Sequence, residues 1–294
     1  MKTCKMKKSI LTAVAVLSVI ACTKQETLAP QQKDQLPIEL SLSVQTKATD
    51  AAYENGDNVG IYVSYESALA ASSNYIDNKK FTLSAGKWTS DTEIYWKDKE
   101  TPADFYCYYP YGAIADATSY SFAVKSDQSA LENYKASDFL WGKRSGALPG
   151  GGAVAISTSH ILSNILIYLK PGEGFTDSEF AAAVKTVKLG NVKTSANVNL
   201  NVGSVTAKGD ASVITPYWTG ECYRAVVIPQ SVAADANLII LTVDGVTYTL
   251  AREFTFAAKT QHKLTVTVNK SSSGLNISIE SWLIDDTEYT GDAK

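Results

Sequence analysis

Histidine and cysteine are scarce in this chain of 294 residues, which contains 2 His and 4 Cys. These side chains supply many transition-metal ligands and the commonest general base near neutral pH. Their scarcity argues against elaborate metal or acid–base chemistry. Charge is also low, because only 19% of residues are charged and the formal net charge is -3. The composition gives no sign of the basic patch that nucleic-acid binders carry, so we expect no nucleic-acid partner.

Short catalytic and metal-binding motifs are absent as well. The sequence contains no C-x-x-C pair, no H-E-x-x-H, no P-loop and no G-x-S-x-G. Gly150-Gly151-Gly152 lacks the Lys-Ser/Thr of a phosphate-binding loop, and Asp285-Asp286 falls far short of the roughly six to eight oxygens of a calcium site. We therefore predict that the protein is not an enzyme, with no catalytic residue, no cofactor and no metal.

One apolar run stands out, and it is too short to span a bilayer. It covers Ile10–Ala21 and follows a basic stretch with Lys2, Lys5, Lys7 and Lys8. The run ends in Val19-Ile20-Ala21-Cys22, which resembles the bacterial lipobox, whose Cys becomes the acylated first residue of the mature protein. An ordinary secretory signal with a chance Cys is the alternative. We expect a signal peptide over 1–22, acylation of Cys22 and a polar tether over 23–35, followed by an exported body.

Two cysteines, Cys107 and Cys222, remain in the exported body. They lie in strand-like runs that are far apart in the chain. A disulfide is compatible with export, and buried free thiols acting as small apolar side chains are at least as compatible.

The clearest strand pattern lies at the front of the mature chain, where Ile38, Leu40, Leu42 and Val44 alternate with polar residues. Alternation with period two predicts a strand with one buried face. Full burial of the four side chains would contribute up to about 6–12 kcal/mol, comparable to the whole stability of a domain. The pattern stops before Lys47. A removable strand that is released at Lys47 and an ordinary edge strand followed by a loop account for this pattern equally well.

The rest of the chain favours short strands separated by turns, which predicts an all-β fold made of β-sandwiches. The expected strands lie at 59–63, 81–83, 87–89, 94–96, 104–109, 120–124, 161–169, 184–189, 198–202, 225–228, 238–243, 247–250, 264–268 and 277–282. A single short helix is expected over 176–184. The glycine-rich stretch 145–152 is the expected junction, giving domains at 36–150 and 151–294 with the junction within 146–175.

The aromatic run Phe105-Tyr106-Cys107-Tyr108-Tyr109 places aromatic side chains on both faces of a strand. This arrangement favours burial, and a stacking platform for sugar rings is the alternative. We expect His160 to be a packed or hydrogen-bonded strand residue and His262 to be an exposed one.

Several short stretches, in this order, resemble fimbrillin-like proteins: "ENGDNVGIYV", "KWTSDTEIYW", "DFYCYYPY", "SDFLWG", "SHILSNILIYL", "YRAVVIPQ" and "ISIESW". The resemblance covers Cys22 to about Trp282. Members of this family are lipoprotein subunits of pili on the surface of Bacteroidales-type bacteria. The resemblance implies two β-sandwich domains of transthyretin-like topology and location at the outer membrane, with other pilus subunits, the membrane and a surface ligand as partners.

The resemblance also implies a maturation step at the first strand. A surface protease cuts the loop after this strand, and a neighbouring subunit supplies a replacement strand. The cut usually follows Arg, whereas the matching position here is Lys47 before Ala48. A lysine-accepting protease or an uncut anchor subunit would account for the difference. The exchanged strand would carry Ile38, Leu40, Leu42 and Val44, and the residues after Trp282 are a candidate donor or tip element.

Two rival interpretations remain on the sequence alone. A surface glycan-binding lipoprotein would use Tyr and Trp side chains to stack on sugars. A secreted β-sandwich hydrolase would need a pair of facing carboxylates.

Overall fold

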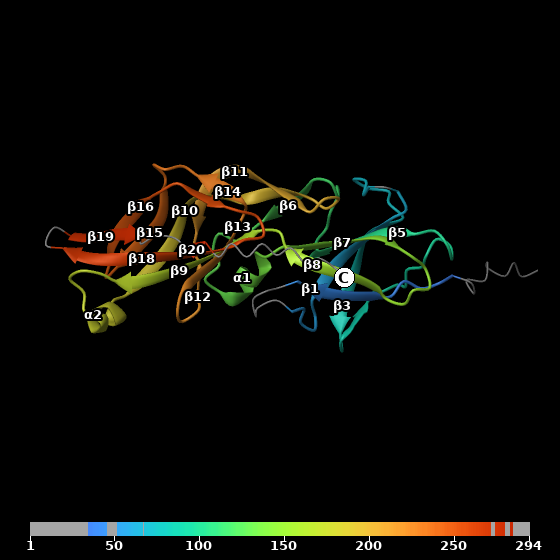
Figure 1. The fold of residues 1–294 in the computed structure, drawn as a ribbon, viewed down its shortest axis with the longest axis horizontal. Coiled ribbons are helices and arrows are strands. Elements are labelled where there is room, and N and C mark those ends of the chain that lie inside the picture. The colour runs from blue at the N-terminus through green and yellow to red at the C-terminus, as the bar shows by residue number, and fades with distance from the viewer. Residues whose placement is uncertain (1–34, 46–51, 67, 272–273, 280–282, 285–294) are drawn as a thin grey trace, which may run out of the picture. The chain divides into compact units, whose positions relative to one another are not determined.

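A computed structural model describes residues 35–45, 52–66, 68–271, 274–279 and 283–284 (Figure 1). Within these ranges the regular secondary structure consists of β-strands, as the sequence predicts, and two short helices. The described part contains no helix that is long and apolar enough to cross a membrane.

The largest sheet, here called the first sheet, has seven strands in the order β1-β8-β7-β5-β2-β3-β4. Their bounds are β1 (Leu40–Val44), β8 (Val154–His160), β7 (Leu140–Ala147), β5 (Ala103–Tyr109), β2 (Asn58–Ser64), β3 (Ile76–Ser84) and β4 (Lys87–Thr89). β1 pairs with β8 in parallel, whereas the other pairs in this sheet are antiparallel. The first sheet therefore joins a strand from the front of the chain to one that lies more than a hundred residues later.

Three further sheets hold the rest of the strands. The second sheet runs β11 (Ser204–Ile214), β10 (Lys185–Asn199), β15 (Asn237–Val243) and β16 (Val246–Ala251), with β6 (Tyr120–Ala123) also paired to β10. The third sheet runs β12 (Tyr217–Trp218), β13 (Tyr223–Val227), β9 (Ser163–Pro171), β18 (Gln261–Ser271) and β19 (Gly274–Ile279), with β20 (Leu283–Ile284) paired to β18. The fourth sheet pairs β14 (Gln230–Val232) with β17 (Phe254–Phe256).

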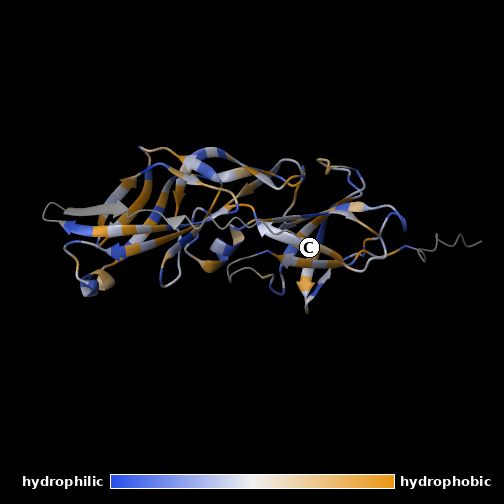
Figure 2. Cartoon of the chain, viewed as in Figure 1, coloured by the Kyte–Doolittle hydropathy of each residue, from blue (hydrophilic) through white to orange (hydrophobic). Residues whose placement is uncertain are grey.

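Side chains on the two faces of the first sheet enter two separate hydrophobic cores, because successive residues of a strand point to opposite faces. Figure 2 shows apolar and polar residues alternating along several of the strands. On β5, Phe105 and Cys107 enter the first core, and Tyr106 and Tyr108 enter the second core. The first core contains Ile38, Leu40, Val59, Ile61, Val63, Phe81, Ile94, Trp96, Ala103, Phe105, Cys107, Ala147, Val154 and Ile156. The second core also takes residues from the second, third and fourth sheets.

The helix predicted near residue 176 is confirmed as α2 (Asp177–Ala182). Thr176 and Glu179 form a capping box, in which each side chain bonds the backbone N–H of the other residue. The helix α1 (Leu131–Ala136) was not predicted from the sequence. Its N-cap is Ala130, whose side chain makes no capping hydrogen bond, so the usual start signal is missing.

The expected strands at 184–189 and 198–202 are wrong as separate elements, because β10 runs unbroken from Lys185 to Asn199. The turn-prone pair Gly190-Asn191 sits where the β10–β11 register shifts, so these residues form an irregularity within the strand rather than a turn. β11 was missed, since its edge position leaves most of its residues exposed and weakens the alternation.

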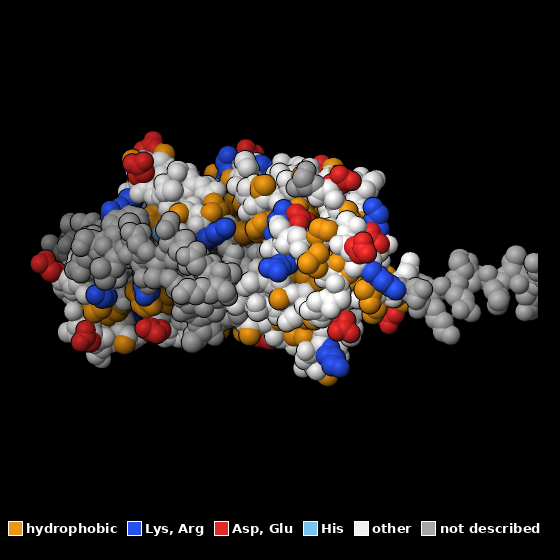
Figure 3. All heavy atoms as spheres, turned by 45° about the vertical axis from the view of Figure 1, so that its right-hand side comes forward, with side chains coloured by type: hydrophobic (Ala, Val, Ile, Leu, Met, Phe, Trp, Pro, Cys, Tyr) orange, Lys and Arg blue, Asp and Glu red, His pale blue; other side chains and the backbone are white. Residues whose placement is uncertain are grey.

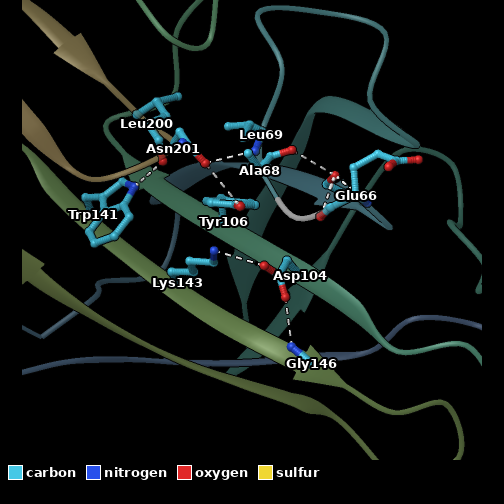
Figure 4. A network of polar contacts seen from close by, with 11 residues as sticks. Glu66, Ala68, Leu69, Asp104, Tyr106, Trp141, Lys143, Gly146, Leu200 and Asn201 are labelled. Carbon is cyan, nitrogen blue, oxygen red and sulfur yellow. Dashed lines mark hydrogen bonds and ion pairs between the residues drawn. The ribbon is translucent and has the colours of Figure 1, made fainter.

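A network of polar contacts joins the first sheet to the turn between β10 and β11 (Figure 4). The Trp141 indole N–H donates to the Leu200 carbonyl at 2.7 Å. The Asn201 Oδ1 accepts the Leu69 N–H at 2.8 Å. Together with the β6–β10 pairing, these bonds connect two halves of the chain, the residues up to the end of β8 and the residues from β9 onward.

The last strand of the first sheet, β8, ends at His160, and β9 of the third sheet begins at Ser163, inside the predicted junction range of 146–175. Earlier in the chain, β6 already pairs with β10 of the second sheet. The division into two domains and the transthyretin-like topology stay predictions. Figure 3 shows Lys, Arg, Asp and Glu side chains of both signs interspersed over the described part of one face.

Candidate strand-exchange edge

β1 occupies one edge of the first sheet, where it lies beside β8 (Figure 1). Leu40 is level with Val154, and Val44 is level with Thr158. The Val154 N–H donates to the Glu39 carbonyl at 2.8 Å, and the Gln45 N–H donates to the Thr158 carbonyl at 2.7 Å. Hydrogen bonds of this kind are backbone contacts that another strand could make in the same place.

The chain just before β1 is paired on a second side. The Ile38 N–H donates to the Ile94 carbonyl at 2.8 Å, and the Trp96 N–H donates to the Leu36 carbonyl at 2.9 Å. The expected strand at 94–96 is therefore a single antiparallel bridge between Pro37 and Tyr95. Removal of this front segment would leave backbone groups unpaired both on β8 and on the 94–96 segment.

The predicted buried face of β1 is present, but its burial falls along the strand. Ile38 and Leu40 are 6% and 8% exposed and belong to the first core. Leu42 and Val44 are only half-buried, because this end of the edge strand lies toward the rim of the core. The assumption of four fully buried side chains is wrong. Ile38 and Leu40 alone would contribute about 3–6 kcal/mol, and the other two would add less.

Thr158 connects β1 to the chain that follows it. Its hydroxyl donates to the Ser43 carbonyl at 3.1 Å and lies 2.7 Å from the Tyr53 hydroxyl. Since the single proton of Thr158 goes to Ser43, the Tyr53 hydroxyl acts as the donor in the second bond. Burial raises the pKa of Tyr53, which keeps this donor protonated.

The Tyr53 ring packs among residues that do not belong to β1. It makes edge contacts with Trp88 at 5.0 Å and with Tyr109 at 6.0 Å between ring centroids. These ring contacts of Tyr53 do not depend on β1 and would remain at the first core if β1 were removed.

Three predicted site residues lie outside the described residues: Cys22, Lys47 and Ala48. The structure thus places Ile38 and Leu40 in the first core and β1 beside β8, while strand exchange, lipidation and cleavage stay predictions. The backbone partners of β1 in β8 and at 94–96 were not found from the sequence. Alternation shows which face of a strand is buried, and it carries no information about the strand alongside.

The aromatic run of β5 is a core element, as predicted from its two aromatic faces. Phe105 and Tyr106 are 0% and 1% exposed. Cys107 and Cys222 are buried free thiols, and burial raises the pKa of Cys107 far above its usual range. Within the described residues no disulfide forms between them.

The two histidines differ from each other. The His160 Nδ1 lies 2.7 Å from the Asp138 Oδ2, which confirms a hydrogen-bonded strand residue. The expectation that His262 is exposed is wrong, because it is 7% exposed between Phe254 and Phe256. Its Nε2 accepts the Ala257 N–H at 3.2 Å. The described chain contains no group of three or more His, Cys, Asp and Glu residues placed to hold a metal.

Comparison with known proteins places this fold in a family. The sequence profile of fimbrillin-like proteins matches residues 46–282, which is most of the chain. The chain belongs to the fimbrillin-like family. Membership points to a structural, non-enzymatic protein that is a subunit of fimbriae at the cell surface.

Relatives of this fimbrillin-like chain have similar lengths and folds. It is 25% identical over 298 residues to a candidate fimbrium subunit, Fim1C, of Bacteroides uniformis, covering 94% of this chain and 96% of the relative. A candidate cell adhesion protein from Bacteroides uniformis superposes with a TM-score of 0.64 at 23% identity, covering 85% of this chain and 97% of that one. A second candidate cell adhesion protein, from Bacteroides ovatus, gives 0.62 at 18% identity, with 86% and 99% covered. These structures share the fold.

Proposed function

We propose that this fimbrial subunit assembles by strand exchange at the β1 position. In this proposal, proteolysis removes β1, and a strand from a neighbouring subunit, of the same or another kind, takes its place. The observation that carries the proposal is the position of β1. It is an edge strand whose apolar face completes the first core, and its removal opens a groove with unpaired backbone on two sides.

The partners of β1 lie within the part of the chain that the family profile matches. The match begins at residue 46, after β1 has ended at Val44. The groove residues on β8 and at Ile94 and Trp96 all lie inside the matched region. The backbone and core partners of β1 therefore belong to the part of the chain that the family profile matches.

The cut would follow Lys47 and leave Ala48 as the new N-terminus. The nearest described residue before this site is Gln45, one position after the end of β1. A protease that accepts lysine would be required, since an arginine-specific enzyme would leave this bond intact.

Mass spectrometry of the N-terminus of subunits sheared from cells tests the cut directly. We expect a mature chain that starts at Ala48. An acylated Cys22 as the sole N-terminus in assembled fibres would overturn strand exchange at β1. A Lys47→Gln variant serves as the matched control, because it should retain β1 and stay out of the fibres.

Export and anchoring follow from the front of the chain. We infer that Cys22 is acylated after removal of the signal peptide and holds the uncut subunit at the outer membrane. A single acyl chain gives only marginal membrane binding, so stable anchoring takes a second chain or another membrane-binding signal. Growth with an alkyne-tagged fatty acid should label the wild-type protein and leave Cys22→Ala unlabelled. Equal labelling of both proteins would overturn acylation at this cysteine.

A further inference from the structure

The loop between β2 and β3 encloses an open cavity of about 300 Å³, away from the β1 groove. Tyr65, Glu66, Ser73, Asn74, Tyr75 and Lys97 contribute most of its polar and aromatic lining. This volume is at the lower end of the range for small-molecule sites.

Two tyrosines form the aromatic wall of the cavity. The centroids of the Tyr65 and Tyr75 rings lie 4.9 Å apart and the ring planes form an angle of 86°, so the two rings pack edge to face. Tyr75 is 41% exposed, so part of its ring is accessible to a ligand. Its hydroxyl donates to the Tyr95 carbonyl at 2.9 Å, so the exposed ring is held in place.

The loop that carries these rings is fastened at several points. Asn74 bonds both backbone groups of Ala70, with its Oδ1 accepting the N–H at 2.9 Å and its Nδ2 donating to the carbonyl at 3.1 Å. Leu69 is 3% exposed in the second core, and its N–H donates to Asn201 (Figure 4). Residues 69–75 of this loop are thus held in place before binding, so they lose little conformational entropy when a ligand binds.

Two opposite charges at the cavity are available for polar contacts. The Glu66 side chain extends away from the hydrogen-bonded part of its loop (Figure 4). The Lys97 ammonium lies 5.4 Å from the centre of the Tyr65 ring. Within the described residues, neither the Glu66 carboxylate nor the Lys97 ammonium has a hydrogen-bonding or ion-pair partner. The Glu66 carboxylate can accept hydrogen bonds, and the Lys97 ammonium can donate them.

We propose that this cavity binds a neutral glycan. A sugar ring has an apolar C–H face and a rim of hydroxyls that both donate and accept hydrogen bonds. The C–H face fits the exposed Tyr75 ring, and the hydroxyls fit Glu66 and Lys97. Glu66 and Lys97 are the charged residues among those that line the cavity, and their charges are opposite, so the lining has no net charge that would favour an anion or a cation. The subunit would thus bind a surface glycan independently of strand exchange.

Isothermal titration calorimetry of the full chain with maltose, cellobiose, lactose and N-acetyllactosamine tests the proposal. We expect a dissociation constant below about 1 mM for at least one disaccharide. Tyr75→Ala should weaken this binding at least about tenfold, and Glu66→Gln should weaken it about threefold to tenfold. Glu66 is exposed, so its variant keeps the fold and guards against an effect of misfolding.

Trp218→Ala is the matched control, because Trp218 is 48% exposed and lies outside the cavity. Its binding should equal that of the wild type. No heat of binding with any of the four disaccharides would overturn the proposal. It would also be overturned by a binding disaccharide whose affinity is unchanged in both cavity variants.

Discussion

Gly203 lies at a position where both the backbone conformation and the neighbouring Trp141 ring exclude a side chain. Its φ of +65° lies in the left-handed region, and an added Cβ would sit 2.3 Å from the Trp141 ring. That ring is fixed by the bond from its N–H to the Leu200 carbonyl. The close approach of the β10–β11 turn to the first sheet thus depends on the absence of a Cβ at this position.

We expect Gly203→Ala to lower the free energy of unfolding by about 2–5 kcal/mol, from backbone strain and overpacking together. Gly209→Ala is the control, since its φ is +76° but no atom lies within 4 Å of the added Cβ. It should cost about 1–2 kcal/mol, from the backbone alone. Urea denaturation measures both values. Equal losses in the two variants would contradict the role given to Trp141.

The two histidines should give opposite dependences on pH. Burial lowers the pKa of His160, but the hydrogen bond and charge of Asp138 outweigh it and raise the pKa above the ordinary 6.5. Its stabilising contribution is therefore present below pH 6.5 and is lost as the pH rises through the raised pKa. Burial lowers the pKa of His262, whose contribution is present above 6.5 and is lost as the pH falls through the window below it.

We therefore expect His160→Gln to cost more stability at about pH 5.5 than at about pH 8.5. For His262→Gln the order should reverse, with the smaller cost at about pH 5.5. Thermal or urea unfolding at the two pH values checks both variants. The same sign of pH dependence in both variants would contradict the direction of the pKa shift assigned to one of the two histidines.

At the scale of the element, β1 is an edge strand with unequal burial along its length. Its first half enters the first core and its second half lies at the rim. The strand therefore combines a strong hydrophobic anchor near Leu40 with a weaker end next to the proposed cut. This gradient favours release that begins at the cut end, where fewer contacts must be broken.

The gradient predicts different costs for two leucines of the same strand. Leu40→Ala should destabilise the intact chain by about 2–4 kcal/mol, because Leu40 is buried. Leu42→Ala, with the same chemical change at a half-buried position, should cost about 1 kcal/mol. Chemical denaturation of the uncut chain measures both. Similar losses at the two positions would mean that β1 is buried evenly.

A reversible crosslink between β1 and β8 tests whether the strand must leave. The Ser43 and Ser157 hydroxyls lie 3.4 Å apart on the exposed side of the pair. A Ser43→Cys/Ser157→Cys disulfide should therefore hold β1 in place even after the Lys47 bond is cut. We expect cut, crosslinked subunits to stay monomeric and to polymerise on reduction, as followed by light scattering.

Ser43→Cys alone should polymerise with or without reductant. Fibres formed by the crosslinked protein before reduction would show that assembly does not use the β1 groove.

At the scale of the whole molecule, the second core is shared between the two halves of the chain. It receives Tyr62 and Tyr106 from the first sheet and Val198 and Ile239 from the second. The β6–β10 pairing and the Asn201 bonds add polar contacts across the same region. Loss of either half would expose apolar surface of the other, so the halves stabilise each other.

A shared core predicts cooperative unfolding. We expect calorimetry of the uncut chain to give one transition, with equal calorimetric and van't Hoff enthalpies. Asn201→Ala should lower the transition temperature without splitting the transition, because it removes an acceptor from the Leu69 N–H. Two separate transitions in the wild type would instead indicate two domains that unfold independently.

The sequence by itself determined which faces are buried and how some elements begin. The alternation around Leu40, the aromatic faces of β5 and the Thr176 cap depend on neighbours within a few residues, and each is present in the structure. Only the tertiary structure decided the partner of β1, the continuity of β10 past Gly190 and the burial of His262. These depend on residues that are distant in the chain, because period-two alternation specifies a face and leaves the adjacent strand open. The groove that could accept a neighbour's strand is therefore a property of the fold, while the strand that fills it can be recognised from the sequence.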